Sequence, residues 1–179
     1  MSNDIYYEKR LNREEHFRIV DNFCCGPDDP LNTFLCDDAF DYEENRLGAT
    51  YLLFENIDNN ILGFYTLKTN AIQIQEDDNL VNALPMIEIS RIAIEYEFQR
   101  NGLGKQLFYE YILPKIKEVA KIVAIFGIMV FVEEDNDRAV AFYEHLGFVK
   151  ANTQVQNQIT DTFNEDCVLY INSLRESDE

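Results

Sequence analysis

The segment Gln99-Arg100-Asn101-Gly102-Leu103-Gly104-Lys105 has the residue types of an anion-binding loop. Its two glycines let backbone N–H groups approach an anion closely, and a helix that starts here adds unpaired donors and the positive end of its dipole. It lacks the third glycine of a dinucleotide fingerprint and the Lys-Ser/Thr ending of a P-loop. The pattern predicts a phosphate site of another kind, and a helix that starts with glycines for close packing is the alternative.

A tyrosine-bearing segment follows later, in Asn136-Asp137-Arg138-Ala139-Val140-Ala141-Phe142-Tyr143-Glu144-His145-Leu146-Gly147-Phe148. Asn136 or Asp137 can cap a helix here, and Gly147 can end it. The phenol of Tyr143, with an ordinary pKa of about 10, can donate a proton at neutral pH. The alternative is a core tyrosine, because the apolar residues recur at helical spacing.

The expected elements place these segments on a mixed α/β domain, since strands and helices alternate in the second half of the chain. A strand precedes each of the two segments. The helices are expected at 13–23, 30–47, 102–120 (kinked or divided at Pro114) and 137–146. The strands are expected at 49–54 and 61–67 as a hairpin, then at 86–94, 122–132 and 167–171, with 75–83 as a loop or short helix.

Length and composition predict one domain, residues 1–179, with a large acidic excess. The chain has 33 acidic and 15 basic residues and a net charge of −18, and the excess runs through all of its parts. Nucleic acid is therefore not an expected partner; a cationic partner fits the charge, and solubility alone is the other explanation. The four cysteines form no CxxC pair and only two histidines are present, so no metal site is expected. The longest apolar run, 122–132, is too short to cross a bilayer, and no signal peptide is evident, so a cytoplasmic protein is expected.

Taken together, Gln99-x-x-Gly102-x-Gly104 and Asn136…Ala139…Phe142-Tyr143-x-x-Leu146-Gly147-Phe148 resemble the two signature segments of the GNAT family of acyl-CoA N-acyltransferases. The resemblance covers about residues 49–150. It implies an α/β (α+β) fold with a mixed, mostly antiparallel central sheet, splayed central strands and flanking helices. It also implies that residues 1–179 form a single GNAT acetyltransferase domain, and that a homodimer is a possible assembly.

The resemblance implies acetyl-CoA as co-substrate and assigns roles to two groups of residues. Tyr143 would lie near the cofactor sulfur as general acid, and Asn136 would touch the cofactor. The backbone of Ile92, Ala93 and Ile94 would pair with the pantetheine arm. The pyrophosphate would be held by the loop of Gln99, Arg100, Asn101, Gly102, Leu103, Gly104 and Lys105, where the side chains of Arg100 and Lys105 either assist or point into solvent.

The implied reaction is direct attack of a primary amine on the thioester in a ternary complex. Such an amine, with a pKa of about 10.4, is only about one part in 10³ neutral at pH 7, so a base must remove a proton. Glu88, four residues before Ile92, has spacing similar to the catalytic glutamate of GNAT histone acetyltransferases. The alternative is a solvated strand carboxylate. Arg91 is expected on the opposite face from Ser90, as a buried ion-pair partner or a surface residue.

The acceptor is open between several classes. Residues 23–26, 31–35, 47–51 and 61–67 resemble a GNAT branch of toxins that acetylate aminoacyl-tRNA, which implies a cationic surface. The acidic charge of every segment departs from that expectation. A small-molecule amine such as a polyamine or an antibiotic, or a protein amine, fits the charge better. A non-catalytic module that binds acyl-CoA or a basic protein is the alternative from outside the enzymes.

Overall fold

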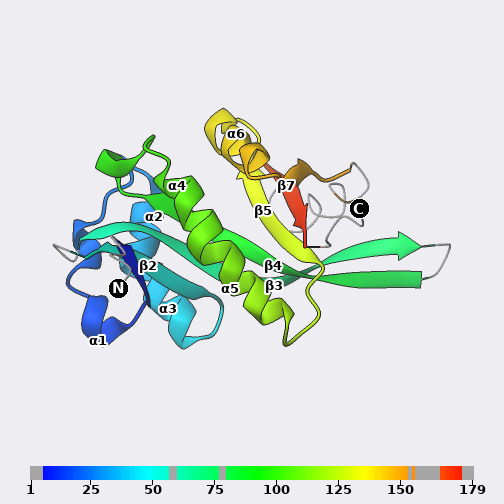
Figure 1. Ribbon diagram of the computed structural model, residues 1–179, viewed down its shortest axis with the longest axis horizontal. Helices are drawn as coiled ribbons and strands as arrows, with labels where there is room; N and C mark the ends of the chain where they lie inside the picture. The colour runs from blue at the N-terminus through cyan, green and yellow to red at the C-terminus, as the bar shows by residue number, and fades with distance from the viewer. Residues whose placement is uncertain (1–5, 57–59, 77–79, 153–154, 156–165, 175–179) are drawn as a thin grey trace. The chain divides into compact units, whose positions relative to one another are not determined.

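A computed structural model describes residues 6–56, 60–76, 80–152, 155 and 166–174 (Figure 1). The chain divides into two compact units, each built from two segments. The first unit joins the chain up to Lys68 with Ser90–Lys115, and the second joins Thr69–Ile89 with the chain from Ile116. Two long strands pass through both units.

The strands form a seven-stranded sheet in the order β1-β2-β3-β4-β5-β7-β6. The pairs β1–β2, β2–β3, β5–β7 and β6–β7 are antiparallel, whereas β4–β5 is parallel. The predicted mixed, mostly antiparallel sheet is therefore confirmed. The strands are β1 (Tyr6–Arg10), β2 (Ala49–Glu55), β3 (Ile61–Glu76), β4 (Leu80–Ile94), β5 (Gly127–Glu133), β6 (Val149–Lys150) and β7 (Cys167–Ser173).

The parallel pairing of β4 with β5 is short. It joins Met86–Glu88 to Gly127–Met129, and Glu88 with Met129 is its last pair. Beyond this point β5 continues to Glu133 with β7 as its partner. The splayed central strands that the sequence predicts begin at Glu88.

Two short helical groups precede β2. Asp29 caps α2 (Pro30–Thr33) by accepting a hydrogen bond from the Leu31 amide at 2.9 Å, and Pro30 occupies the first turn, as predicted. The helix continues through a π-helical turn, η2 (Phe34–Asp38), into α3 (Ala39–Glu44). The single helix expected at 13–23 was wrong. It is divided into α1 (Arg13–His16) and a 3₁₀ turn, η1 (Val20–Asn22), after which the chain turns extended at Phe23.

These helices cover one face of β2 and β3 with a continuous apolar core. Leu52 and Phe64 lie opposite each other across the two strands and are fully buried. Phe34 stacks on Phe64 with ring centroids 6.2 Å apart, and Phe23 meets the same ring edge-on at 5.3 Å. The strand alternation predicted for 49–54 and 61–67 thus positions the core of the first unit.

The opposite face of β2 and β3 carries a polar cluster that ties β1 to the helix after β4. Tyr51 and Tyr65 stack there with ring centroids 5.2 Å apart. The Tyr65 hydroxyl donates to the Glu8 carboxylate, and the Lys115 ammonium lies 2.7 Å from Glu8 and 4.2 Å from the centre of the Tyr51 ring. Burial, with the Glu8 carboxylate as a smaller cause, raises the pKa of Tyr65. We call Glu8, Tyr51, Tyr65 and Lys115 the edge-strand cluster.

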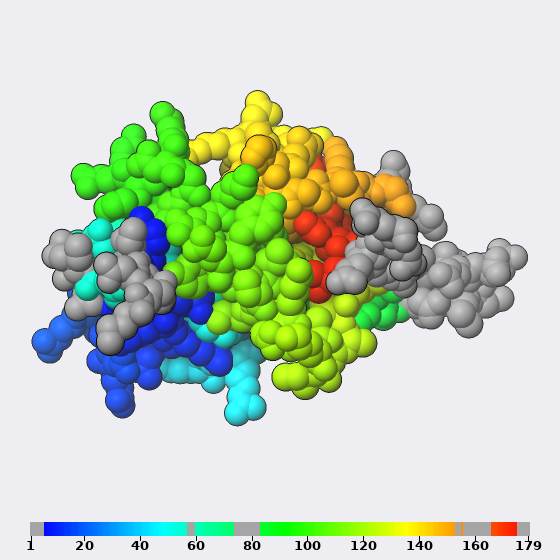
Figure 2. Space-filling model, viewed as in Figure 1, coloured from blue at the N-terminus to red at the C-terminus, as the bar shows by residue number. Residues whose placement is uncertain are grey.

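The helix after β4 changes type along its length. It runs through α4 (Leu103–Gln106), a π-helical segment η4 (Leu107–Ile112) and α5 (Leu113–Ala120), and its outer side lies on the face drawn in Figure 2. Pro114 has no N–H, and in regular α-helix its ring would clash with the carbonyl four residues earlier. The wider π turn precedes this proline, so the predicted division of the helix is confirmed.

In the second unit, Ile72, Met86, Met129 and Leu169 form a buried core. The helix α6 (Asp137–His145) lies where the sequence predicts it. Two boundaries differ. The strand expected from Ile122 begins only at Gly127, and Ile122 is 83% exposed in the connection after α5. Of the loop or short helix expected at 75–83, residues 75–76 and 80–83 belong instead to β3 and β4, and residues 77–79 lie outside the described residues.

In the described residues, no helix is long and apolar enough to cross a membrane. The same part of the chain contains no group of three or more His, Cys, Asp or Glu side chains that could hold a metal ion. Its four cysteines are all free thiols.

Candidate functional site

The loop after β4 presents a row of free backbone donors. Within the described residues, no acceptor is found for the N–H groups of residues 100–105, and the first helical bond runs from the Gln106 amide to the Gly102 carbonyl at 3.0 Å. Arg100 and Gly102 have φ angles of 65° and 82°, on either side of Asn101. Alternation of left-handed and ordinary backbone makes successive N–H groups converge into an anion-binding nest. The geometry therefore supports the predicted phosphate site.

Gly102 separates the two explanations of the glycine loop. Any other residue at this position would have to adopt the left-handed backbone conformation, which non-glycine residues rarely do. A Cβ at this position would meet no atom within 4 Å. Close packing therefore does not explain Gly102. Its left-handed conformation and the open space around it suit the approach of a ligand to the backbone.

Hydrogen bonds from Gln99 hold this loop in position. Its side-chain amide donates to the carbonyls of Cys25 at 2.6 Å and Ile94 at 2.8 Å, and its backbone N–H donates to Tyr96 at 3.3 Å. The Gln99 N–H groups are thus engaged within the turn, and the contact of Gln99 with the pyrophosphate stays a prediction. Those N–H groups hold the turn in shape, and residues 100–105 carry the free donors.

The two basic residues of the loop are exposed. Arg100 lies at the left-handed position, and Lys105 holds its ammonium 5.9 Å from the centre of the Tyr109 ring. Both remain available to an anion. Whether they assist the cofactor stays a prediction.

The end of β4 has one buried residue, Ala93, between the partly buried Ile92 and Ile94.

Arg91 matches neither of its two expected roles. Its guanidinium carbon lies 5.0 Å from the centre of the Phe34 ring, and one of its N–H groups donates to the Ser90 carbonyl at 2.6 Å. Arg91 is thus half-buried on an aromatic ring. The strand pattern could show that it faces away from Ser90, but not that Phe34 would meet it.

Glu88 is the one carboxylate that is buried among the described residues, with 4% of its surface exposed. The alternative of a solvated strand carboxylate is therefore wrong. Its Oε2 accepts a hydrogen bond from the Asn70 side-chain amide at 2.6 Å. Since Glu88 also closes the β4–β5 pairing, its carboxylate lies on the strand where the two central strands begin to part.

Tyr143 has a buried ring on α6. Phe142 and Phe148 meet the ring edge-on, with centroids 5.2 and 5.4 Å away. The described residues supply no hydrogen bond to its phenol, and they contain no fully buried polar side-chain atom without a partner, so the hydroxyl is not completely buried although Tyr143 as a whole is only 7% exposed. Burial raises the pKa of Tyr143, which keeps the phenol protonated at neutral pH. The buried ring agrees with the alternative of a core tyrosine, and the role of Tyr143 as general acid stays a prediction.

Asn136 caps α6 through its amide oxygen, which accepts from the Ala139 N–H at 3.0 Å. This confirms the predicted helix start. The contact of Asn136 with the cofactor stays a prediction.

Comparison with known proteins decides the family. Residues 15–148 of this chain match the acetyltransferase (GNAT) family, which is more than half of its length. The chain belongs to the GNAT family. The resemblance predicted from the glycine loop and the Tyr143 segment is thereby confirmed.

Three sequence relatives carry acetyltransferase names. The chain is 32% identical to an uncharacterized N-acetyltransferase in the pepI 3' region of Lactobacillus delbrueckii subsp. lactis, over 63% of this chain and 62% of that protein. It is 32% identical to mycothiol acetyltransferase of Paenarthrobacter aurescens, over 59% of this chain and 29% of that protein. It is 24% identical to tRNA(Met) cytidine acetyltransferase TmcA of Actinobacillus pleuropneumoniae, over 87% of this chain and 23% of that protein. The chain therefore spans less than two thirds of each of these relatives.

Solved structures of the same fold come from toxin-type GNAT proteins. AtaTR bound with AcCoA matches at 23% identity and a TM-score of 0.73, over 94% of both chains. AtaT complexed with acetyl-methionyl-tRNAfMet matches at 22% identity and a TM-score of 0.70, over 92% of this chain and 93% of that one. A KacTA–DNA complex matches at 24% identity and a TM-score of 0.70, over 94% and 92%. These matches confirm the GNAT fold.

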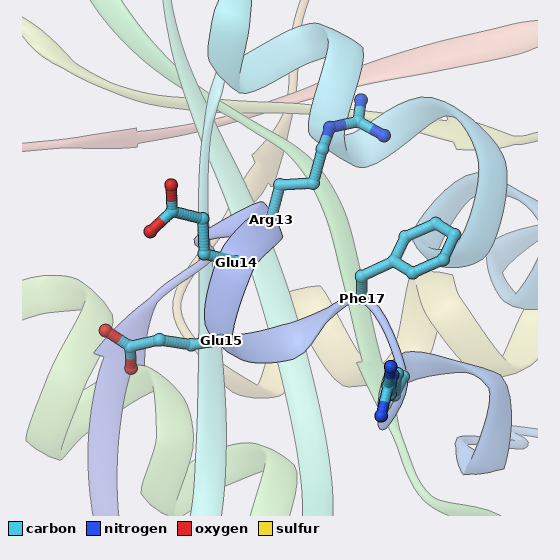
Figure 3. A pocket seen from close by; sticks show the side chains of 5 residues that line it. Arg13, Glu14, Glu15 and Phe17 are labelled. Carbon is cyan, nitrogen blue, oxygen red and sulfur yellow. The ribbon is translucent and has the colours of Figure 1, made fainter.

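A separate hollow of about 490 Å³ lies on α1 and contains none of the GNAT signature residues (Figure 3). Arg13 and Phe17 point to one side of α1, and Glu14 and Glu15 point to the other. Arg13 already pairs with Asp41 at 2.9 Å and with Glu44 at 2.6 Å. This hollow therefore adds no candidate chemistry.

One neighbour of a predicted site residue was missed from the sequence. Asn70 contacts Glu88 through the β3–β4 hairpin, and nothing in its sequence surroundings distinguishes it. Finding it would require the pairing register of β3 with β4. The expected loop at 75–83 concealed that pairing.

Proposed function

We propose that this chain is an N-acetyltransferase that moves the acetyl group of acetyl-CoA to a primary amine by direct attack in a ternary complex. The observation that carries the proposal is the row of free N–H groups at residues 100–105. Those donors fit a pyrophosphate, and the partly buried backbone of Ile92–Ile94 fits the predicted pairing with pantetheine. Acetyl-CoA would supply the activated acyl group as a thioester.

In this proposal Glu88 removes a proton from the acceptor ammonium, directly or through water. The neutral nitrogen attacks the acetyl carbonyl, so a C–N bond forms and the C–S bond breaks. Tyr143 gives its phenolic proton to the departing sulfur. The nitrogen, which carries an extra proton after the attack, returns that proton to the phenolate, and Glu88 releases the first proton to solvent. A buried carboxylate suits the base, and a phenol whose pKa burial raises, and which is therefore protonated at neutral pH, suits the acid. Two of the GNAT neighbours were solved as tyrosine-to-phenylalanine mutants of AtaT and KacT, which draws attention to a tyrosine in those toxins.

The first test is calorimetric titration of the purified protein with acetyl-CoA, with Gly104→Glu as control. A Kd in the micromolar range that the substitution raises at least tenfold is expected, because a carboxylate would enter the ring of N–H donors. No binding by the wild type would refute the cofactor assignment. Release of CoA thiol is then followed with spermidine, an aminoglycoside and a lysine peptide.

Two substitutions separate an enzyme from a module that only binds acyl-CoA or a basic protein. Glu88→Gln and Tyr143→Phe should each lower kcat at least tenfold while the Kd for acetyl-CoA changes less than threefold. If both variants acetylate as fast as the wild type, the assigned chemistry is wrong. If no amine is acetylated but acetyl-CoA binds, the module is favoured.

An aminoacyl-tRNA acceptor is a second candidate, favoured by the AtaT complex with acetyl-methionyl-tRNAfMet, which matches 92% of this chain. The net charge of −18 argues against it, since most of the protein surface would repel the phosphates. Acetylation of charged tRNA, with growth arrest on expression, would favour this candidate. Acetylation of spermidine or a peptide without arrest would favour the amine. One domain over residues 1–179 and a homodimer remain family-based proposals.

A further inference from the structure

Arg91 is the one arginine among the described residues whose side chain is not exposed. It lies against the Phe34 ring, and the only hydrogen bond found for its side chain in that part of the protein runs from Nη1 to the Ser90 carbonyl at 2.6 Å. A guanidinium has five N–H groups, so four of them have no acceptor among the described residues. Those residues contain no fully buried polar side-chain atom without a partner, so Nε and Nη2 are not fully enclosed.

The charge of Arg91 is also unbalanced. No carboxylate of the described residues lies within salt-bridge distance of it, although the chain has a net charge of −18. In the same unit the exposed Arg10 pairs with Glu43 at 2.8 Å. A partly buried charge without a counter-ion is costly, and the contact with Phe34 offsets part of that cost without engaging the remaining N–H groups. The free donors and the charge of Arg91 therefore suit an anionic ligand.

Arg91 stands next to the segment that is proposed to bind pantetheine. In the proposed function the pyrophosphate lies at residues 100–105, and the pantetheine arm runs back along Ile92–Ile94. The thioester at the far end of this arm is therefore expected beside the residues that precede Ile92. The pairing of β4 with β5 ends at Glu88, so β5 does not separate the two faces of β4 along this edge beyond that residue. Arg91 thus lies on the strand at the acyl end of the cofactor.

We propose that Arg91 binds an anionic group of the acceptor, so that the small amine acetylated by this protein also carries a carboxylate or a phosphate. The inference rests on the proposed function and names its substrate class. A planar guanidinium can donate two parallel hydrogen bonds to either group, which orients the acceptor as well as attracting it. The net charge of −18 by itself favours polyamines, so Arg91 points to a different class of amine from the one that the overall charge predicts.

The test compares pairs of amines that differ in one anionic group. Lysine is compared with cadaverine, which lacks its carboxylate, and O-phosphoethanolamine with ethanolamine, by the steady-state release of CoA. In at least one pair, kcat/KM of the wild type should be at least about tenfold higher for the anionic amine, because only this amine makes the charge-assisted hydrogen bonds. The two pairs distinguish a carboxylate from a phosphate. Equal rates within both pairs, or faster acetylation of both amines without the anion, would overturn the inference.

Three variants test whether the preference comes from Arg91. Arg91→Gln should reduce it to less than about threefold, while the Kd for acetyl-CoA also changes less than about threefold. Arg91→Lys keeps the charge but loses the planar pair of donors, so it should show an intermediate preference. The matched control is Arg18→Gln, since Arg18 is an exposed arginine of the same unit without an ion pair in the described residues, and it should behave as wild type. An equal loss of rate with both members of each pair, in both Arg91 variants, would show a merely structural role and overturn the inference.

Melting temperatures test the same binding without turnover, because a ligand of the folded state stabilises it. With CoA present, the preferred anionic amine should raise the melting temperature of wild type and Arg18→Gln more than its partner amine does. The difference should vanish in Arg91→Gln, and no difference in wild type would overturn the inference. If the wild type acetylates no amine, the proposed function fails, while this comparison still decides whether Arg91 holds an anionic amine. Acetylation of charged tRNA alone, with no small anionic amine accepted or bound, would overturn the small acceptor.

Discussion

Gly102 offers a substitution whose steric and electrostatic effects can be separated. Its φ is 82°, and a Cβ there would meet no atom within 4 Å. Gly102→Gln therefore adds a side chain to open space, with a backbone strain of about 1–2 kcal/mol for left-handed geometry. Gly102→Glu adds the same volume and the same strain, and it also adds a negative charge where the pyrophosphate is proposed to lie.

The difference between the two variants measures the charge alone. Two unit charges about 4 Å apart interact by about 1 kcal/mol in water and by about 4 kcal/mol near a protein surface. An intermediate interaction energy of about 2 kcal/mol predicts that Gly102→Glu binds acetyl-CoA about thirtyfold more weakly than Gly102→Gln. The gap should narrow as salt is added, because exposed charges are screened.

The assay is calorimetric titration of acetyl-CoA into each variant at two salt concentrations, with the melting temperature as a check on folding. Both variants should melt a few degrees below wild type, and by the same amount. Equal affinity of the Gln and Glu variants, at either salt concentration, would refute a phosphate beside Gly102. A gap that salt does not change would refute the electrostatic explanation.

Three further predictions concern groups outside the proposed chemistry. Native protein treated with iodoacetamide at pH 8 should be modified at exposed Cys24 at least tenfold faster than at Cys25, because burial raises the pKa of the Cys25 thiol to about 12; peptide mass spectrometry that finds equal labelling would contradict this. Thr50→Val should lower the free energy of unfolding by about 1–3 kcal/mol, since the buried Thr66 hydroxyl loses its 2.8 Å partner; denaturant unfolding should show that adding Thr66→Val recovers part of the loss. Burial lowers the pKa of His16, so as the pH drops the unfolded chain binds a proton at this histidine before the folded protein does. Stability should therefore fall as pH drops through about 6.5. Melting temperatures that do not change from pH 7.5 to 5.5, or that change equally in His16→Asn, would exclude a contribution of His16.

Local signals in the sequence predicted the elements that carry their own boundary residues. Asp29-Pro30 marked the start of α2, and Asn136 with Gly147 bracketed α6. The signals failed where the end of an element depends on distant partners. Ile122 and Val123 are apolar enough to extend β5, yet they lie exposed in the connection from α5. Strand β1 has no local signature, because it is held by contacts with β2 and with the edge-strand cluster.

The same distinction between local signals and distant partners applies to the candidate site. The glycine loop and Tyr143 could be found because their spacing reflects a local turn and a helix face. The sequence did not show that the N–H groups of Gln99 bind carbonyl oxygens of the chain itself, because one of these acceptors belongs to the distant Cys25. Burial of Glu88 and its contact with Asn70 depend on the register of a hairpin, which is a property of two strands together. No pattern within either strand encodes it.

The edge-strand cluster has a consequence for the order of events during synthesis. Glu8 contacts Tyr65 and Lys115, and the latter is made roughly a hundred residues after β1. At about 5–20 residues per second, β1 waits on the ribosome for about 5–20 s before its last partner emerges. During that time β1 can pair with β2 but lacks the contact of Glu8 with Lys115, so a second nascent chain could compete with it for the outer edge of β2. Translation speed along this stretch should therefore govern how much of the protein aggregates, and a slow codon run before Lys115 would lengthen the exposure.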